Sequence, residues 1–353
     1  MNNLWKKIKV GNMELPHRLA MAPMTRGRAL YDGSPSDLSV EYYKQRASMG
    51  LLISEGTQPS EDGQGYLNTP GIYNENHIKG WKKITQRVHD EGGYFFIQLM
   101  HVGRMSHPDN TPHHRQAVAP SAIAPGVEMF TAEGMKEIPV PRELSTEDIK
   151  NVVKEHREAA AATIKAGADG VEIHGANGYL IHQFIGENSN QRKDEYGGTI
   201  ESHARFAIEV TKAIVEEIGP EKTGFRISPN VPLGGIDEGK QGPDVYRYLV
   251  KELDKLNLAY LHVLHGGNEE LLSDIRSIWS NTLLVNRGGR PLEDISVDID
   301  NDLADIAPIG TWTIANPDFV ARLKNGAQLN EPDRNTFYTG GEKGYIDYPF
   351  LKS

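Results

Sequence analysis

The chain has 353 residues, a formal net charge of −10 and no cysteine. Its length suits two average domains or one large α/β barrel, and its negative charge argues against nucleic acid or an anionic membrane as a partner. The lack of cysteine excludes disulfides, thiolate-bound metals and thiol catalysis, so any redox chemistry requires a bound cofactor. The N-terminal stretch MNNLWKKIKV has no apolar core, and no window is apolar enough to span a membrane, which predicts a cytoplasmic protein.

A short β-rich run, a loop and a longer amphipathic segment recur along the chain. The predicted strands are Leu19–Thr25, Leu51–Thr57, Tyr94–Met100, Gly170–His174, Gly224–Ser228, Tyr260–Leu264, Leu283–Asn286 and Ile306–Ile309. The predicted helices are Ser36–Met49, Glu75–Glu91, Ser145–Ala166, Glu201–Ile218, Pro243–Leu256, Glu269–Ile278 and Leu292–Leu303. About eight alternations without a break favour a closed (β/α)8 TIM barrel over an open doubly wound sheet. We expect a single domain over residues 1–353.

One connection breaks this alternation. About forty residues, roughly 102–144, follow the third predicted strand, which is far longer than an ordinary connection and predicts a partly ordered lid. His107, His113 and His114 lie in this segment. Without clustered carboxylates or regular spacing, they favour a solvated loop over a metal site.

The stretch GVEIHGANGYLIHQ, residues 170–183, joins a strand to a cluster of polar and ring-bearing side chains. The alternation in Gly170–Ile173 is typical of a strand, and His174, Asn177 and Tyr179 follow on a glycine-rich turn. Taken alone, a histidine is more often structural and a tyrosine more often a packing ring. Together on one turn, a donor pair, an amide and a phenol can point into a single pocket.

Barrel enzymes place their chemistry on the loops after the carboxyl ends of the strands. Here these ends carry Thr25, Glu55, Gly56, Gln98, His101, His174, Asn177, Tyr179, Arg226, His265, Gly266, Gly267, Arg287, Gly288, Gly289, Gly310 and Thr311. None is a lysine, which argues against a Schiff-base aldolase, and the pattern of a metal-dependent amidohydrolase is missing. Amide and guanidinium donors, with glycines after the last two strands, suit an aromatic anionic cofactor such as flavin mononucleotide, FMN.

The segment HGANGYLIHQFIGENSNQRKDEYGG resembles the signature of the Old Yellow Enzyme family, the FMN-dependent ene-reductases. Further similar segments follow in family order along nearly the whole chain: LAMAPMTRGRA, SEGTQPS, FIQLMHVGR, APSAI, FRISP, IANPDFVARL and FYTGGEKGYIDYP. The resemblance implies non-covalent FMN, with NADPH or NADH as electron donor. It implies reduction of activated C=C bonds in enones, enals and nitroalkenes, and of nitro compounds, by a monomer or homodimer.

The same resemblance implies roles on the substrate side. His174 and Asn177 would donate hydrogen bonds to the carbonyl or nitro oxygen, drawing charge from the alkene so that hydride from flavin N5 reaches the β-carbon. Tyr179 would protonate the α-carbon as a general acid. Tyr66 and Tyr338 would line the substrate entrance. Some relatives have histidine where Asn177 stands, and both side chains can donate.

The resemblance also implies the flavin contacts. Thr25 resembles the residue that bonds the C4 oxygen, and Gln98 and Arg226 resemble the partners of the pyrimidine edge. At that edge, a guanidinium stabilises the negative charge of reduced flavin. The full expected cofactor set is Pro23, Met24, Thr25, Gly56, Gln98, His174, Asn177, Arg226, Gly288, Gly289, Arg290, Gly310 and Thr311.

Two positions depart from the family pattern. Many relatives have arginine after the glycine that follows the eighth strand, whereas this chain has Thr311. Arg287 or Arg290 can supply the missing charge beside the phosphate, and this role for Arg290 is only slightly favoured over a solvated loop. Met100 stands where many relatives carry tryptophan. Its flexible thioether either admits bulkier substrates or fills the gap.

Two other functions stay open from the sequence. A metal-dependent hydrolase on the same barrel would use His174, His265 and Glu55 as ligands and would bind no flavin. A flavin-binding storage or sensor protein would have no need of a tyrosine acid over the ring. The FMN-dependent ene-reductase is the favoured interpretation.

Overall fold

A computed structural model describes residues 2–351, and its centre is a barrel of eight parallel strands. In chain order the strands are β3 (Leu19–Met21), β4 (Leu51–Ile53), β5 (Tyr94–Leu99), β10 (Gly170–Gly175), β11 (Thr223–Ile227), β12 (Tyr260–Leu264), β13 (Thr282–Asn286) and β14 (Ala307–Ile309). A parallel bridge between Leu284 and Ile306 brings the last two strands together and closes the ring. The predicted (β/α)8 barrel is confirmed.

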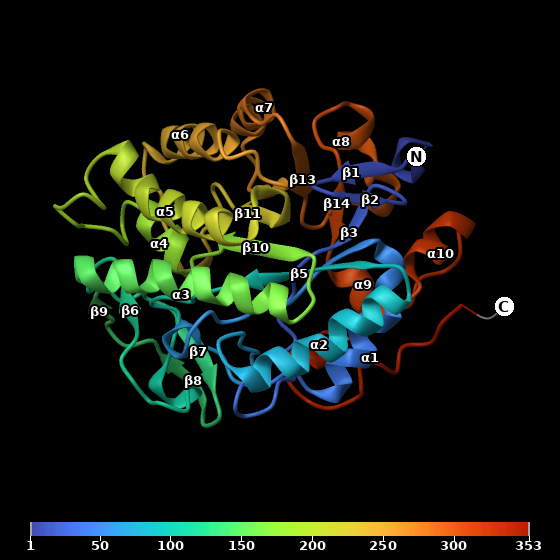
Figure 1. Cartoon of the computed structure of the whole chain (residues 1–353), viewed down its shortest axis with the longest axis horizontal. Coiled ribbons are helices and arrows are strands. Elements are labelled where there is room, and N and C mark those ends of the chain that lie inside the picture. The colour runs from blue at the N-terminus through green and yellow to red at the C-terminus, as the bar shows by residue number, and fades with distance from the viewer. Residues whose placement is uncertain (1, 352–353) are drawn as a thin grey trace.

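Helices cover the outside of this barrel (Figure 1). They are α1 (Asp37–Gln45), α2 (Glu75–Asp90), α3 (Thr146–Lys165), α4 (Leu180–Ile185), α5 (Ile200–Ile218), α6 (Gly242–Asp254), α7 (Glu269–Ile278), α8 (Val297–Asp300), α9 (Thr311–Ala315) and α10 (Phe319–Asn325). The strands are almost continuously buried because helices pack on one face and barrel side chains fill the other. None of the helices in residues 2–351 is long and apolar enough to cross a lipid bilayer.

A hairpin that was not among the predicted elements closes the amino end of the barrel. Strands β1 (Ile8–Val10) and β2 (Met13–Leu15) pair antiparallel. Their apolar side chains join a buried cluster with Phe96, Tyr260 and Leu284 from the barrel strands. The opposite end, where the strands finish, is therefore the open end.

The lid predicted after the third barrel strand is present, between β5 and α3. It contains the short strands β6 (Val118–Ala119) and β9 (Arg142–Glu143), and the hairpin of β7 (Glu128–Thr131) and β8 (Gly134–Glu137). The buried Asn110 donates its side-chain amide to the carbonyls of Gly65 and Phe130. The hairpin is thereby tied to the loop that follows β4.

Several predicted boundaries are wrong. The helix expected over Leu292–Leu303 consists only of a 3-10 turn, Leu292–Asp294, and the short α8. This segment is rich in aspartate, which favours caps and turns over helix interiors, and Asp298 is engaged by two arginines. The first two strands end at Met21 and Ile53, four residues earlier than predicted in each case. The residues beyond them form loops at the open end.

Candidate active site

Two adjoining cavities lie where the barrel strands end. The first, called here the donor cavity, has a volume of about 790 Å³, and the second, the glycine cavity, about 770 Å³. Both are lined by Pro23, Met24, Arg226 and Thr311. The other predicted residues of the donor cavity are Thr25, Gly56, Tyr66, Gln98, His174, Asn177, Tyr179 and Tyr338. Those of the glycine cavity are Gly288, Gly289, Arg290 and Gly310. The structure thus brings together every predicted site residue.

His174 and Asn177 form a pair of uncharged donors. His174 Nδ1 accepts the backbone N–H of Ala176 at 3.2 Å, which leaves the ring proton on Nε2. Burial, and then the charge of Arg226, hold the pKa of His174 well below its usual range, so the ring is neutral. Asn177 adopts a left-handed conformation with φ of 57°, and its Oδ1 is buried without a hydrogen-bond partner. His174 therefore keeps its Nε2–H for a ligand. The Asn177 side chain makes no hydrogen bond within residues 2–351, so its amide N–H groups are also free to donate.

Tyr179 and Tyr66 are joined phenol to phenol. The Tyr179 hydroxyl donates to the Tyr66 hydroxyl at 3.1 Å, and the Tyr179 ring meets the His174 ring edge-on with centroids 5.0 Å apart. Burial, and then Tyr66, raise the pKa of Tyr179 well above its ordinary value. At neutral pH this phenol keeps its proton. Tyr338 lines the same cavity but is 65% exposed, which places it at the mouth.

Arg226 is a buried cation without a carboxylate partner in the described part of the chain. It is 5% exposed, it makes no ion pair within residues 2–351, and its Nε has no hydrogen bond. Beside it, Gln98 Nε2 donates to Glu172 Oε1 at 2.7 Å, so Gln98 Oε1 remains an acceptor. Glu172 is held in turn by His262 at 2.9 Å. A buried guanidinium of this kind requires an anionic or acceptor-rich ligand, and the pyrimidine edge of a flavin fits that requirement.

Met100, which stands where many relatives carry tryptophan, packs beside Gly56 in the wall of the donor cavity. A Cβ atom at Gly56 would lie 2.4 Å from Met100 Sδ, so the thioether packs directly against this glycine. Met100 is buried and lines the donor cavity. The thioether thus fills the space beside Gly56 and still forms part of the cavity wall, and its effect on substrate size stays a prediction.

The lid adds residues that the sequence reading missed. Met105, Met129 and Met135 of the lid line the donor cavity, beside Met24 and Met100, which the sequence analysis had already singled out. Phe130, which is 60% exposed on the lid hairpin, also reaches its rim. The alternation of residues 128–131 is the only sequence signal for this strand, and it says nothing about which cavity the strand covers.

The glycine cavity contains several arginines with different surroundings. Arg290 donates to both oxygens of Asp298, at 2.9 and 3.2 Å. Arg287 is bound more fully, to Asp298 at 2.7 Å and to both oxygens of Glu269. Arg334, another residue missed by the sequence reading, lines the same cavity and makes no ion pair within residues 2–351. Arg290 and Arg334 therefore keep N–H groups that can bind a ligand, whereas the charge of Arg287 is paired with two carboxylates.

The chain matches a known enzyme family over most of its length. A family model described as the NADH:flavin oxidoreductase / NADH oxidase family matches residues 3–330. The chain belongs to this family. It is therefore an FMN-dependent oxidoreductase of the Old Yellow Enzyme type, with NADH or NADPH as the reductant.

Relatives of this Old Yellow Enzyme family member match nearly end to end. A probable flavin mononucleotide-dependent alkene reductase of Leishmania infantum is 40% identical, over 98% of this chain and 97% of that protein. The 12-oxophytodienoate reductase 2 of Arabidopsis thaliana is 38% identical, over 98% and 95%. Among solved structures, morphinone reductase in complex with tetrahydroNAD has a TM-score of 0.95 and 40% identity, covering 99% of this chain and 98% of that one.

The metal-hydrolase alternative is not supported in this family member. The Glu55 carboxylate accepts the backbone N–H groups of Arg26 and Gly27, each at 3.0 Å, so it is already bound by the protein backbone. His265 lies instead beside Arg287. Within residues 2–351, no group of three histidine or carboxylate side chains is arranged to hold a metal ion. The lid histidines His113 and His114 likewise bond backbone carbonyls.

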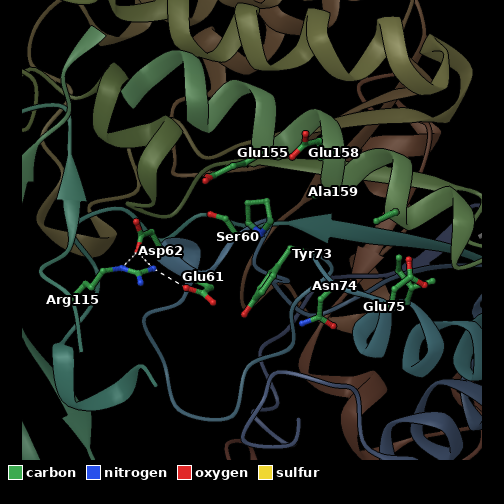
Figure 2. A pocket seen from close by; sticks show the side chains of 13 residues that line it. Ser60, Glu61, Asp62, Tyr73, Asn74, Glu75, Arg115, Glu155, Glu158 and Ala159 are labelled. Atoms are coloured by element: carbon green, nitrogen blue, oxygen red, sulfur yellow. Dashed lines mark hydrogen bonds and ion pairs between the residues drawn. The ribbon is translucent and has the colours of Figure 1, made fainter. Parts of the chain in front are cut away.

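A separate acidic groove lies on the outside of the barrel, between the loop after β4 and helix α3 (Figure 2). Glu61, Asp62, Glu155 and Glu158 line it. Arg115 of the lid is paired with Glu61 at 3.0 Å and with Asp62 at 2.7 Å. None of the predicted site residues lines this groove, which is therefore separate from the two cavities at the strand ends.

Proposed function

We propose that this protein reduces alkenes conjugated to a carbonyl or nitro group, namely enones, enals and nitroalkenes, with nitro compounds as further substrates. One observation carries the proposal: two uncharged donors and a protonated phenol meet in a single cavity, beside an arginine that has no carboxylate partner among residues 2–351. The names of the alkene reductase and 12-oxophytodienoate reductase relatives support the same substrate class.

The residues around the two cavities suit non-covalent FMN. Gln98 and Arg226 would bind the pyrimidine edge of the ring, and Thr25 the C4 oxygen, with backbone groups of residues 23, 24 and 56 against the ring. Arg290 and the backbone of Gly288, Gly289, Gly310 and Thr311 would bind the phosphate. When bound and reduced by NADPH or NADH, FMN supplies a hydride from N5 to the substrate's β-carbon.

His174 and Asn177 would act on the substrate oxygen. His174 Nε2–H and the Asn177 side-chain amide donate hydrogen bonds to it, and they strengthen as negative charge develops there during hydride addition. Because His174 is neutral, it stabilises that charge without giving up its proton. The buried position raises the electrostatic effect of both donors, since little water is present to screen them.

Tyr179 would complete the reaction by protonating the α-carbon. Its raised pKa means that it releases its proton only to a strong base, such as an enolate formed beside it. Tyr66 accepts the Tyr179 hydroxyl in the resting site and so holds the phenol toward the cavity. Tyr338 and the lid methionines would form the entrance through which the substrate arrives.

Replacement of Tyr179 by phenylalanine tests this assignment, because the ring stays and only the hydroxyl is lost. Flavin reduction by NADPH or NADH should be nearly unchanged in stopped-flow measurements. Reoxidation by cyclohexenone should slow by about 100-fold or more. A nitroalkene should still be consumed, because its nitronate product can leave and take a proton from water.

Equal slowing of both half-reactions would show that Tyr179 shapes the cavity rather than donating a proton. Wild-type protein that binds FMN but is not bleached by NADPH or NADH would instead point to the storage or sensor function.

A further inference from the structure

A buried hydrogen-bond chain lies behind the turn that carries the donor and the phenol. His182, on α4, accepts the backbone N–H of Gly178 through Nδ1 at 3.0 Å. Its Nε2 lies 2.8 Å from Glu238 Oε1, which also accepts the hydroxyl of Tyr246 at 2.8 Å. The second oxygen of Glu238 accepts the backbone N–H of Asn230 at 3.0 Å. The chain of contacts therefore runs from α6 through a carboxylate to the active-site turn.

This arrangement fixes the orientation of the His182 ring. Nδ1 accepts a hydrogen bond, so the ring proton lies on Nε2 and is donated to Glu238. The side chain of His182 is 0% exposed and that of Glu238 is 7% exposed. Turning the ring over would set carbon atoms against both partners and leave buried polar groups without hydrogen bonds, which is costly. His182 is thus a rigid acceptor.

Gly178, whose N–H His182 accepts, has little conformational freedom. Gly178 has φ of 82°, and a Cβ there would lie 2.3 Å from the carbonyl oxygen of Leu233. Its own carbonyl accepts the side-chain amide of Gln183 at 2.8 Å. Side chains of α4 therefore bind both the N–H and the C=O of Gly178, the residue between Asn177 and Tyr179.

A shift of this turn would disturb the backbone conformation of Asn177 most. Its φ of 57° lies in the left-handed region, which side chains other than glycine occupy at a cost. Its backbone N–H is held by Ser228 Oγ at 2.8 Å, and the next N–H in the chain is the one that His182 holds. These two bonds pin the peptide groups on either side of the Asn177 side chain.

We infer that His182 is a positioning residue for the substrate donors. By accepting the N–H of Gly178, it keeps Asn177 in its left-handed conformation and sets the Asn177 amide and the Tyr179 phenol on one rigid turn. Glu238 acts through His182 by holding the proton on Nε2. This inference rests on the proposed function, because it assigns His182 a purpose only if Asn177 and Tyr179 meet the substrate.

Two substitutions at His182 separate its two contacts. In His182→Asn the side-chain oxygen can take the place of Nδ1, which keeps the acceptor for Gly178 but loses the reach to Glu238. In His182→Gln the longer side chain places its amide near Nε2, which keeps the contact with Glu238 but removes the acceptor. Glu238 retains the Tyr246 hydroxyl and the Asn230 N–H in both variants.

The readout is titration of each FMN-loaded variant with 4-hydroxybenzaldehyde, followed by the long-wavelength charge-transfer band that phenolates give over oxidised flavin in this family. His182→Asn should bind within about 3-fold of wild type, because the acceptor is kept. His182→Gln should bind about 10-fold or more weakly, and reoxidation by cyclohexenone should slow similarly, because the buried N–H loses its partner. Thermal unfolding of the same samples records any loss of stability separately.

Two binding results would contradict the role of His182. Equal phenol affinity in His182→Gln and wild type, or equally weak binding in both variants, overturns the inference. If His182→Gln does not fold, His182→Leu replaces it as the variant without an acceptor, and failure of both to fold shows a purely structural role. Wild-type protein that gives no phenol band and does not reduce cyclohexenone refutes the proposed function instead.

Discussion

Replacement of Arg226 by methionine is expected to lower the reduction potential of bound flavin. Arg226 is 5% exposed at the end of β11 and has no ion pair within residues 2–351, so its charge is available to the ligand. Reduced flavin carries negative charge near N1, which a guanidinium stabilises more than it stabilises the oxidised ring. Methionine keeps an unbranched side chain of similar reach and removes the charge.

The size of the effect follows from the contact that is lost. A hydrogen bond to a charged group contributes about 1.5 to 3 kcal/mol. Because about 1.4 kcal/mol corresponds to about 30 mV for a two-electron couple, the potential should become roughly 30 to 65 mV more negative. Glu172, which binds Gln98 and His262 beneath the site, has less positive charge beside it in the variant, and this acts in the same direction.

Equilibration with a dye of known potential measures this shift. Arg226→Lys is the matched control, because it keeps the charge but not the planar donor pair, and it should give a smaller shift. FMN content and thermal unfolding show whether the variants remain loaded and folded. A potential within about 10 mV of wild type, or a shift to more positive values, would refute the placement of Arg226 at the flavin ring.

Three further predictions follow from the site and the core. Reoxidation by an enone should be constant from about pH 6 to 9 in stopped-flow measurements, because burial raises the pKa of Tyr179 well above 10 and lowers that of His174 well below 6.5; a decline centred near pH 7 would contradict this. Arg290→Ala should weaken FMN binding to the apoprotein by about 10- to 150-fold and leave riboflavin binding unchanged, since riboflavin has no phosphate; equal losses in a fluorescence titration would remove Arg290 from the phosphate site. Burial lowers the pKa of His156 from 6.5 to about 4, so the unfolded chain binds this proton more tightly. The free energy of unfolding should therefore fall by up to about 3 kcal/mol between pH 6.5 and 4, and urea unfolding of His156→Leu should show a flatter profile.

Much of the barrel could be predicted because its elements satisfy local and periodic rules at once. The helix after the lid begins as predicted, since Ser145 and Asp148, which form its capping box, are only three positions apart in the sequence. Strand ends were less predictable. Apolar residues continue past Met21, but Pro23 has no N–H to donate to a ladder, and the chain turns into the cavity loops.

The residues of the site also fall into those that the sequence predicts and those that only the structure shows. His174, Arg226 and the other residues at strand ends could be predicted, because a closed barrel gathers these ends at one rim. Arg334 and Phe130 could not, because a loop near the carboxyl end and a lid hairpin reach the cavities only through tertiary packing. His182 lies inside the stretch singled out from the sequence, yet its use depends on Glu238, more than fifty residues away.

The methionines around the donor cavity also expose this enzyme to chemical damage. A thioether takes up one oxygen to become a sulfoxide, which is polar and bulkier than the sulfur it replaces. Met135 is 57% exposed on the lid, whereas Met13, Met21 and Met49 are buried in the barrel core. Mild peroxide should therefore alter substrate fit while the barrel stays folded, and sulfoxide reductases can reverse the change. Met135 of the lid is consequently the cavity methionine most open to oxidation, since Met105 and Met129 are buried.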